Sequence, residues 1–188
     1  MSTLMKTYTI SLHGFWKYQA DVFDENYALV ARSELKRREV SVDFSNNRRR
    51  VLMRHGFLRQ EYKLIDENGD VISYSHPKMT KYPLTFYIEC DKEWLRIERS
   101  GFFHISYIFY NALQPIAWIK KKGMFSRTYE LKICESSTPL IIDIISIAVG
   151  VVVFDAVDSA AASAASAGSV SAAATAGAVS ASAASSSR

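Results

Sequence analysis

The sequence is poor in the residues that disulfide scaffolds and structural metal sites require. It holds two cysteines, Cys90 and Cys134, among 188 residues. Two cysteines cannot staple a chain of this length, and these two lack the spaced Cys and His partners of a zinc site. The first residues also lack a charged segment followed by an apolar run and a small-residue cleavage site. We therefore exclude a disulfide scaffold and expect two buried or idle thiols and no secretory signal. The expected location is the cytoplasm, with peripheral contact to a membrane as the alternative.

Long hydrophobic runs are also scarce. The clearest is Ile144–Phe154, with an aspartate on each side. Thr138 suits an N-cap and Pro139 the first helical position, and a helix here is apolar on every face, so protein or lipid must enclose it. The run is shorter than the roughly 20 residues of a membrane span, and the flanking charges oppose extending it. We favour a helix over about 139–157 that is buried in protein, with a membrane tail anchor as the alternative.

A change of composition divides the chain into a domain at 1–158 and a tail at 159–188. The tail holds 24 Ala or Ser among 30 residues and one charge, Arg188. Such side chains bury too little surface to offset the cost of ordering the backbone. The composition predicts a disordered tail, or a weak helix without tertiary contacts.

Short apolar and aromatic runs of period two, separated by turn residues, indicate a mainly β domain. One hairpin is expected around Asn68 and Gly69, at positions suited to positive φ, and another around 111–114. The stretch 27–35 fits a strand or a short helix capped by Asp24. About a dozen strands of even spacing predict a barrel or a sandwich. The other candidates are 6–12, 15–23, 40–44, 49–55, 84–90, 94–99 and 128–133.

No motif for catalysis or cofactor binding is visible. The sequence lacks a phosphate-cradling glycine loop, a nucleophile elbow and a Cys/His pair joined to a third group. Residues 66–70 resemble a calcium loop only superficially, since the glycine stands at the fourth position and no glutamate follows at the twelfth. We expect no enzyme, no cofactor and no metal. Four histidines lie too far apart to be metal ligands on one element: His13, His55, His76 and His104.

Positive charge is concentrated in two places. Residues 32–63 hold ten Lys or Arg against four acids, and a second cluster precedes Met124 and Phe125. Clustered cations beside exposed apolar residues suit an anionic bilayer, although solvated strand ends and turns have the same composition. Nucleic acid is an unlikely partner, because the net charge of the whole chain is only +4. The predicted lipid-binding residues are Arg48, Arg49, Arg50, Lys120, Lys121, Lys122 and Arg127.

The order of these segments resembles the tubby C-terminal-like superfamily, nearest to its LURP-one-related and phospholipid scramblase branch. The likeness is carried by the hairpin Tyr62–Gly69, the strand at Trp94, the strand Ile116–Lys121 and the closing helix Asp143–Asp155. The resemblance implies a closed barrel of about twelve strands that encloses the C-terminal hydrophobic helix. It also implies a non-enzymatic module that binds anionic phospholipid or phosphoinositide headgroups. The alternatives are a protein-interaction or stress-response scaffold and a membrane-anchored, scramblase-like protein.

Overall fold

The computed structural model describes residues 4–14, 18–56, 61–76, 84–88, 94–100, 106–123 and 126–183. These residues form a mainly β body followed by a C-terminal helix, which confirms that part of the sequence prediction. The strands are β1 (Met5–His13), β2 (Gln19–Phe23), β3 (Leu29–Lys36), β4 (Glu39–Phe44), β5 (Arg49–His55), β6 (Glu61–Ile65), β7 (Val71–His76), β8 (Leu84–Ile88), β9 (Trp94–Ser100), β10 (Ser106–Asn111), β11 (Gln114–Lys121) and β12 (Thr128–Cys134).

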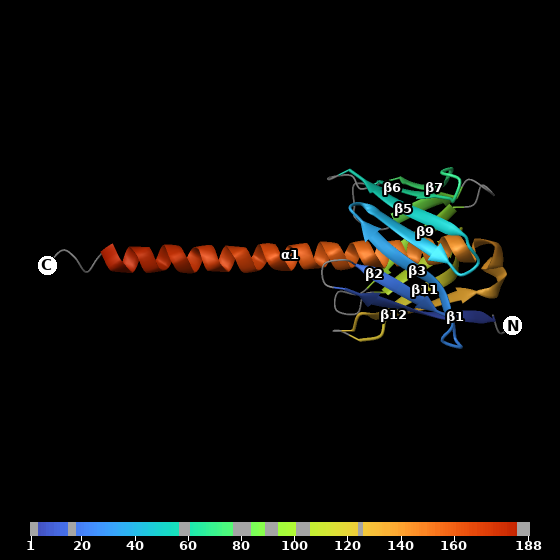
Figure 1. The fold of residues 1–188 in the computed structure, drawn as a ribbon, viewed down its shortest axis with the longest axis horizontal. Helices are drawn as coiled ribbons and strands as arrows, with labels where there is room; N and C mark the ends of the chain where they lie inside the picture. The colour runs from blue at the N-terminus through green and yellow to red at the C-terminus, as the bar shows by residue number, and fades with distance from the viewer. Residues whose placement is uncertain are drawn as a thin grey trace. The chain divides into compact units, whose positions relative to one another are not determined.

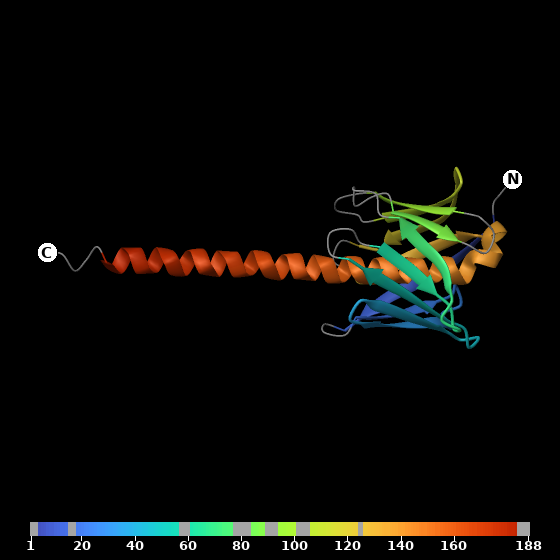
Figure 2. The ribbon, with the colours of Figure 1, turned by 90° about the horizontal axis from the view of Figure 1, so that it is seen from above.

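Every strand is antiparallel to its neighbours, and the strand order is that of a closed barrel. Consecutive strands pair throughout, and β1 also pairs with β12, where Met5 lies opposite Cys134. The strands surround the beginning of the C-terminal helix in both ribbon views (Figures 1 and 2). Because successive strands alternate in direction, the connecting turns gather at two ends. We call the end where β12 finishes and the helix begins the proximal end, and the other the distal end.

The segment that fitted either a strand or a helix is the strand β3. The Asp24 carboxylate accepts hydrogen bonds from the backbone N–H groups of Asn26 and Ala28, each at 2.9 Å. Tyr27 adopts a φ of 61°. Asp24 therefore closes a tight turn between β2 and β3 instead of capping a helix. In the β6–β7 turn Gly69 has the expected positive φ of 91°, whereas Asn68 is not among the residues with positive φ.

The C-terminal helix begins later than the sequence predicted. Residues Glu135–Leu140 form a 3₁₀ helix, η2, and the α-helix α1 spans Ile141–Ala183. The φ that proline imposes suits both helix types, so Pro139 was a poor guide to the α-helical start. Within the barrel unit, the side chains of Ile144, Ile145, Ile147, Ala148, Val149, Val151, Val152 and Val153 are buried.

Small side chains make room for this helix inside the barrel. Ala20, Ala31, Ser33, Ser73 and Ser75 are buried strand residues. On the helix, a Cβ added to Gly150 would lie 2.2 Å from Leu52 Cδ2 and 3.2 Å from Leu52 Cβ and Cγ. The helix therefore approaches β5 closely at Gly150, and this contact needs a residue without a side chain.

The chain divides into two compact units, Met1–Val153 and Phe154–Arg188. In the second unit α1 continues to Ala183, beyond the predicted end near 157. Alanine has the most favourable helix propensity, which explains why the helical geometry has no break where the composition changes. The predicted lack of tertiary contacts in the tail stays a prediction.

Within the ranges given above, no helix has both the length and the hydropathy that crossing a membrane requires.

Candidate functional site

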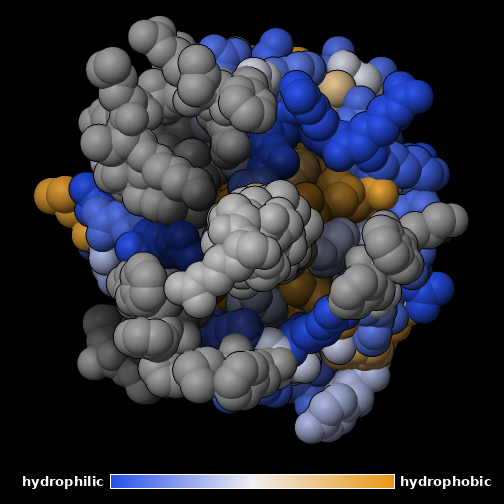
Figure 3. Space-filling view, turned by 90° about the vertical axis from the view of Figure 1, so that its left-hand side faces the viewer, coloured by the Kyte–Doolittle hydropathy of each residue, from blue (hydrophilic) through white to orange (hydrophobic). Residues whose placement is uncertain are grey.

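The described turns at the two ends of the barrel carry opposite charge. At the proximal end, the described turn residues 24–28, 45–48, 66–70, 112–113 and 135–140 include six acids and one base, Arg48. At the distal end, the described turn residues 14, 18, 37–38, 56, 122–123 and 126–127 include four bases and no acid. Figure 3 faces the distal end and shows mainly hydrophilic side chains on its described surface. The distal end is thus the place where an anion would be attracted.

The lysine cluster of the sequence prediction lies at this distal end. Lys120 and Lys121 close β11, and Lys122 begins the β11–β12 turn. Lys120 and Lys122 are exposed and Lys121 is half-buried. Lys122 Nζ donates to Thr9 Oγ1 at 3.4 Å, and exposed Arg127 donates from a terminal nitrogen to the Gly14 carbonyl at 2.8 Å. These bonds orient two of the cations without neutralising them.

Sequence reasoning did not assign Arg37 and Arg38 to the site. They form the β3–β4 turn, where Arg37 has a φ of 58° and the Arg38 carbonyl accepts from the Arg54 N–H at 2.8 Å. Both side chains are exposed. Only the β1–β2 connection separates this turn from the β11–β12 turn along the distal rim. We call Arg37, Arg38, Lys120, Lys122 and Arg127 the distal basic rim; within the described part of the chain no carboxylate forms an ion pair with them.

The predicted arginine cluster lies elsewhere. Arg48 precedes β5 and Arg49 begins it, both at the proximal end. Strands β5 and β11 are six positions apart in the strand order, on opposite sides of the barrel. Arg49 Nε lies 3.5 Å from Asp43 Oδ1 on the neighbouring strand β4. The structure therefore does not bring the two predicted clusters together.

Arg50 has a structural role, because it is nearly buried and forms two ion pairs. Its side chain is only 12% exposed, and its Nε donates to Asp143 Oδ1 at 3.0 Å. A terminal nitrogen of Arg50 also pairs with Glu67 in the β6–β7 turn. Burial opposes the charge of Arg50, but the hydrogen bonds and charges of both carboxylates raise its pKa overall. This ion-pair cluster joins the first turn of α1 to β5 and to the β6–β7 turn, and it leaves Arg50 unsuited to a lipid headgroup.

Asp143, like Arg50, is influenced by burial and by its ion-pair partner in opposite directions. Burial raises the pKa of its carboxyl, while the hydrogen bond and charge of Arg50 act in the opposite direction. A carboxylate in the first turn of a helix also interacts favourably with the helix dipole. The sequence signal for this ion pair was Asp143 itself, because an acid that becomes buried is usually paired with a cation.

The turn at 66–70, which resembles a calcium loop, is stabilised by backbone hydrogen bonds to its own Asp66 carboxylate. The Asp66 carboxylate accepts from the N–H groups of Asn68 and Asp70, each at 2.9 Å. The backbone hydrogen bond from Asp70 is the largest cause that lowers the pKa of Asp66. In the ranges that the structure describes, no group of three or more His, Cys, Asp or Glu is placed to hold a metal.

The remaining residues named from sequence are dispersed. His13 lies 3.5 Å from Asp21, and His55 ends β5 with an exposed side chain. Cys134 is a free, buried thiol. Cys90, His104, Met124 and Phe125 lie outside the described residues, as does the side chain of His76.

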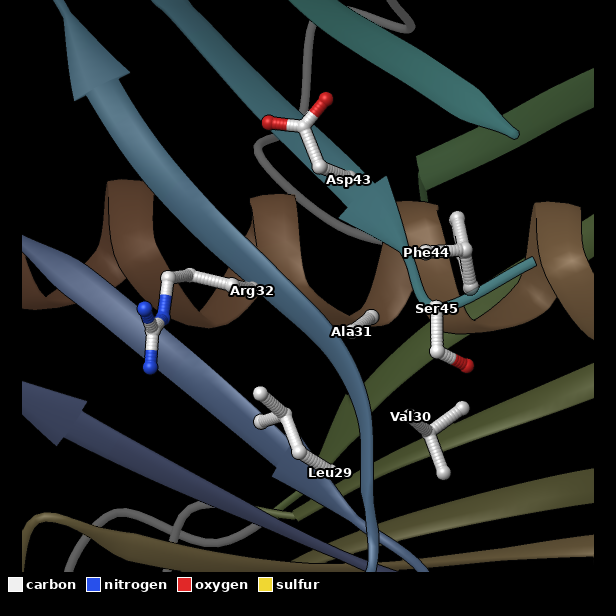
Figure 4. A pocket seen from close by; sticks show the side chains of 7 residues that line it. All are labelled: Leu29, Val30, Ala31, Arg32, Asp43, Phe44 and Ser45. Carbon is white, nitrogen blue, oxygen red and sulfur yellow. The ribbon is translucent and has the colours of Figure 1, made fainter. Parts of the chain in front are cut away.

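A small hollow of about 140 Å³ lies over β3 and β4 (Figure 4). Its charged lining residues are engaged, since Arg32 Nε lies 2.8 Å from Asp21 Oδ1 and Asp43 pairs with Arg49. Its apolar lining consists of Leu29, Val30, Ala31 and Phe44, and Leu29 and Val30 lie on either side of β3 in Figure 4. A hollow of this size would accept one small apolar side chain.

Comparisons with known proteins reveal similarity in fold and not in sequence. No protein-family model and no curated protein matches this sequence. The chain is similar to a protein from Arabidopsis thaliana whose X-ray structure is known, with a TM-score of 0.51 and 9% sequence identity. The match covers 77% of this chain and 90% of that one. At this level of identity the likeness shows that the two chains share a fold, and nothing about a shared activity.

Proposed function

We propose that this chain is a tubby-like, non-enzymatic module that binds the headgroups of anionic phospholipids through the distal basic rim. The observation that supports the proposal most is the clustering of five exposed cations at one end of the barrel, without carboxylate partners among the described residues. The resemblance of the sequence to the tubby-like superfamily, and within it to the LURP-one-related and scramblase branch, motivates the choice of lipid.

The electrostatics favour a charged surface as the ligand. Each Lys or Arg near an anionic bilayer contributes about 1 kcal/mol, and the contribution decays within a Debye length of about 10 Å at 0.1 M salt. Cations from two different turns, at 37–38 and 120–127, would reach the same plane of headgroups because both turns lie at the same end. The proposed site therefore keeps Lys120, Lys122 and Arg127 of the sequence prediction. It omits residues 48–50 and adds Arg37 and Arg38.

Vesicle sedimentation tests the proposal. Purified protein is sedimented with vesicles of phosphatidylcholine alone, or with added phosphatidylserine or a phosphoinositide, at two salt concentrations. We expect recovery only with anionic vesicles, decreasing as salt rises. Equal recovery with neutral vesicles would refute the proposal.

A pair of charge-matched variants locates the surface. Lys120→Ser with Lys122→Ser removes two distal cations, and Arg48→Ser with Arg49→Ser removes two proximal ones. The distal variant should lose about 2 kcal/mol, or roughly 30-fold in partitioning, whereas the proximal variant should resemble the wild type. Equal losses in both variants would show that net charge, and not the distal basic rim, drives the association.

A further inference from the structure

Among the residues that the structure describes, the exposed large hydrophobic side chains lie at the proximal end of the barrel. Tyr27 and Leu113 are each 82% exposed, and they stand in the β2–β3 and β10–β11 turns. Leu4 precedes β1, and the other three are the first residues of β1, β3 and β7. Single exposed apolar residues are common at protein surfaces, so what matters is whether these six lie together. Within the described residues the set is Leu4, Met5, Tyr27, Leu29, Val71 and Leu113.

Five of these residues belong to one continuous stretch of the rim. The Glu135 N–H donates to the Leu4 carbonyl at 3.0 Å, which places the start of β1 beside the end of β12. The Cys134 thiol lies 3.9 Å from the Pro115 carbonyl, beside the turn that carries Leu113. We call Leu4, Met5, Tyr27, Leu29 and Leu113 the apolar arc; Val71 lies farther around the barrel.

Carboxylates accompany the apolar arc. Asp24 and Glu25 share the turn with Tyr27, and Glu135 adjoins Leu4. The pKa of Tyr8 in β1 is raised first by burial and then by the charges of Asp24 and Glu25, so these carboxylates lie near β1 as well. Leu29 also lines the hollow over β3 and β4, which continues the apolar surface on the outside of the barrel (Figure 4).

We propose that the apolar arc is a docking surface for a protein segment that carries lysine or arginine among apolar side chains. Charge complementarity selects this occupant, because carboxylates beside apolar anchors attract a cationic apolar peptide. Anionic headgroups would be repelled by the same carboxylates. Tyrosine is a frequent anchor in protein interfaces, and Tyr27 and Leu113 are the most exposed members of the arc. This surface is separate from the distal basic rim, so the proposal does not depend on lipid binding.

Fluorescence anisotropy with a labelled synthetic peptide tests the proposal. The probe is an amphipathic peptide of leucine and lysine, and its counterpart has glutamate in place of lysine. The full chain should bind the lysine peptide and bind the glutamate peptide at least about tenfold more weakly. Similar binding of both peptides would overturn the proposal.

Variants then assign the binding to the arc. Tyr27→Asn with Leu113→Ser should weaken binding of the lysine peptide about tenfold; asparagine tolerates the positive φ of Tyr27. Asp24→Asn with Glu25→Gln should weaken binding and flatten its salt dependence, since asparagine can still accept the turn hydrogen bonds. Lys63→Ser, an exposed residue of β6 that belongs to neither surface, is the control and should not weaken binding. If the first variant lowers the thermal midpoint, Leu113→Ser alone replaces it.

Two results would refute the assignment. One is unchanged peptide affinity in both proximal variants. The other is a wild-type chain that sediments with neutral vesicles and loses this sedimentation in the Tyr27→Asn, Leu113→Ser variant, because the arc would then be a membrane-inserting surface.

Discussion

Replacing Gly150 with alanine tests how closely α1 packs inside the barrel. The new Cβ would lie 2.2 Å from Leu52 Cδ2 and 3.2 Å from two further atoms of the same side chain. Leu52 is fully buried, so its side chain has little room to turn away. Overpacking of this kind costs about 1–3 kcal/mol, whereas alanine improves helix propensity by about 1 kcal/mol relative to glycine. We expect a net loss of up to about 2 kcal/mol.

A double-mutant cycle separates the two terms. Leu52→Ala alone should destabilise the fold by about 2–5 kcal/mol because it leaves a cavity. Combined with Gly150→Ala, the added methyl group enters that cavity, so the double variant should be more stable than the sum of the single changes predicts. The expected coupling is about 1–3 kcal/mol, equal to the relieved overlap.

Chemical denaturation of all four proteins provides the measurement, with the m-value checked for constancy. The packing would be refuted if Gly150→Ala stabilises the protein by its full helix propensity and the cycle shows no coupling. In that case Leu52 and the helix would not be in contact.

Four other changes have defined outcomes. Val149→Asp should place an unpaired carboxylate among buried side chains, cost several kcal/mol and make the whole barrel protease-sensitive; a resistant β domain in limited proteolysis would support a membrane anchor instead. Asp143→Asn should lower the free energy of unfolding by about 1.5–3 kcal/mol in chemical denaturation, because Arg50 loses a charged hydrogen-bond partner; an unchanged free energy of unfolding would contradict this role. The lowered pKa of Asp66 means that its stabilising effect is present above its ordinary pKa and is lost as pH falls through the lowered folded value; carboxyl NMR titration should find a midpoint below that in the urea-denatured chain. Deleting residues 159–188 should shift the thermal midpoint by no more than a few degrees, and a larger decrease measured by calorimetry would show that the tail packs.

Local patterns predicted most of the strands. The expected strand 49–55 coincides with β5, and 40–44 lies one residue inside β4. Period-two alternation and turn residues act over a few residues, so the sequence displays them directly. The pairing of β1 with β12 joins residues at opposite ends of the domain. No local pattern encodes that pairing. The strand spacing predicted a barrel or a sandwich without deciding between them, and the family resemblance favoured the closed barrel.

The site was harder to predict because neighbours in sequence need not be neighbours in space. Arg38 and Arg48 are ten residues apart, yet the strand β4 between them places them at opposite ends of the barrel. A strand of this length extends over roughly 20 Å. Conversely, Arg50 forms a hydrogen bond with Asp143, which is 93 residues farther along the chain. Counting charges along the chain therefore identified the basic segments. It could not show that Arg50 belongs to a structural ion pair, or that the other cations lie on two separate surfaces.

The pairing of the first strand with the last has a consequence for biosynthesis. Met5 cannot meet Cys134 until nearly the whole domain has left the ribosome, and the helix that occupies the interior is made later still. Contacts of such long sequence separation slow folding, and the unpaired edges of β1 and β12 stay available to other chains during the delay. We therefore expect an obligately post-translational, slow-folding domain, for which truncated or stalled nascent chains are the species most prone to aggregation.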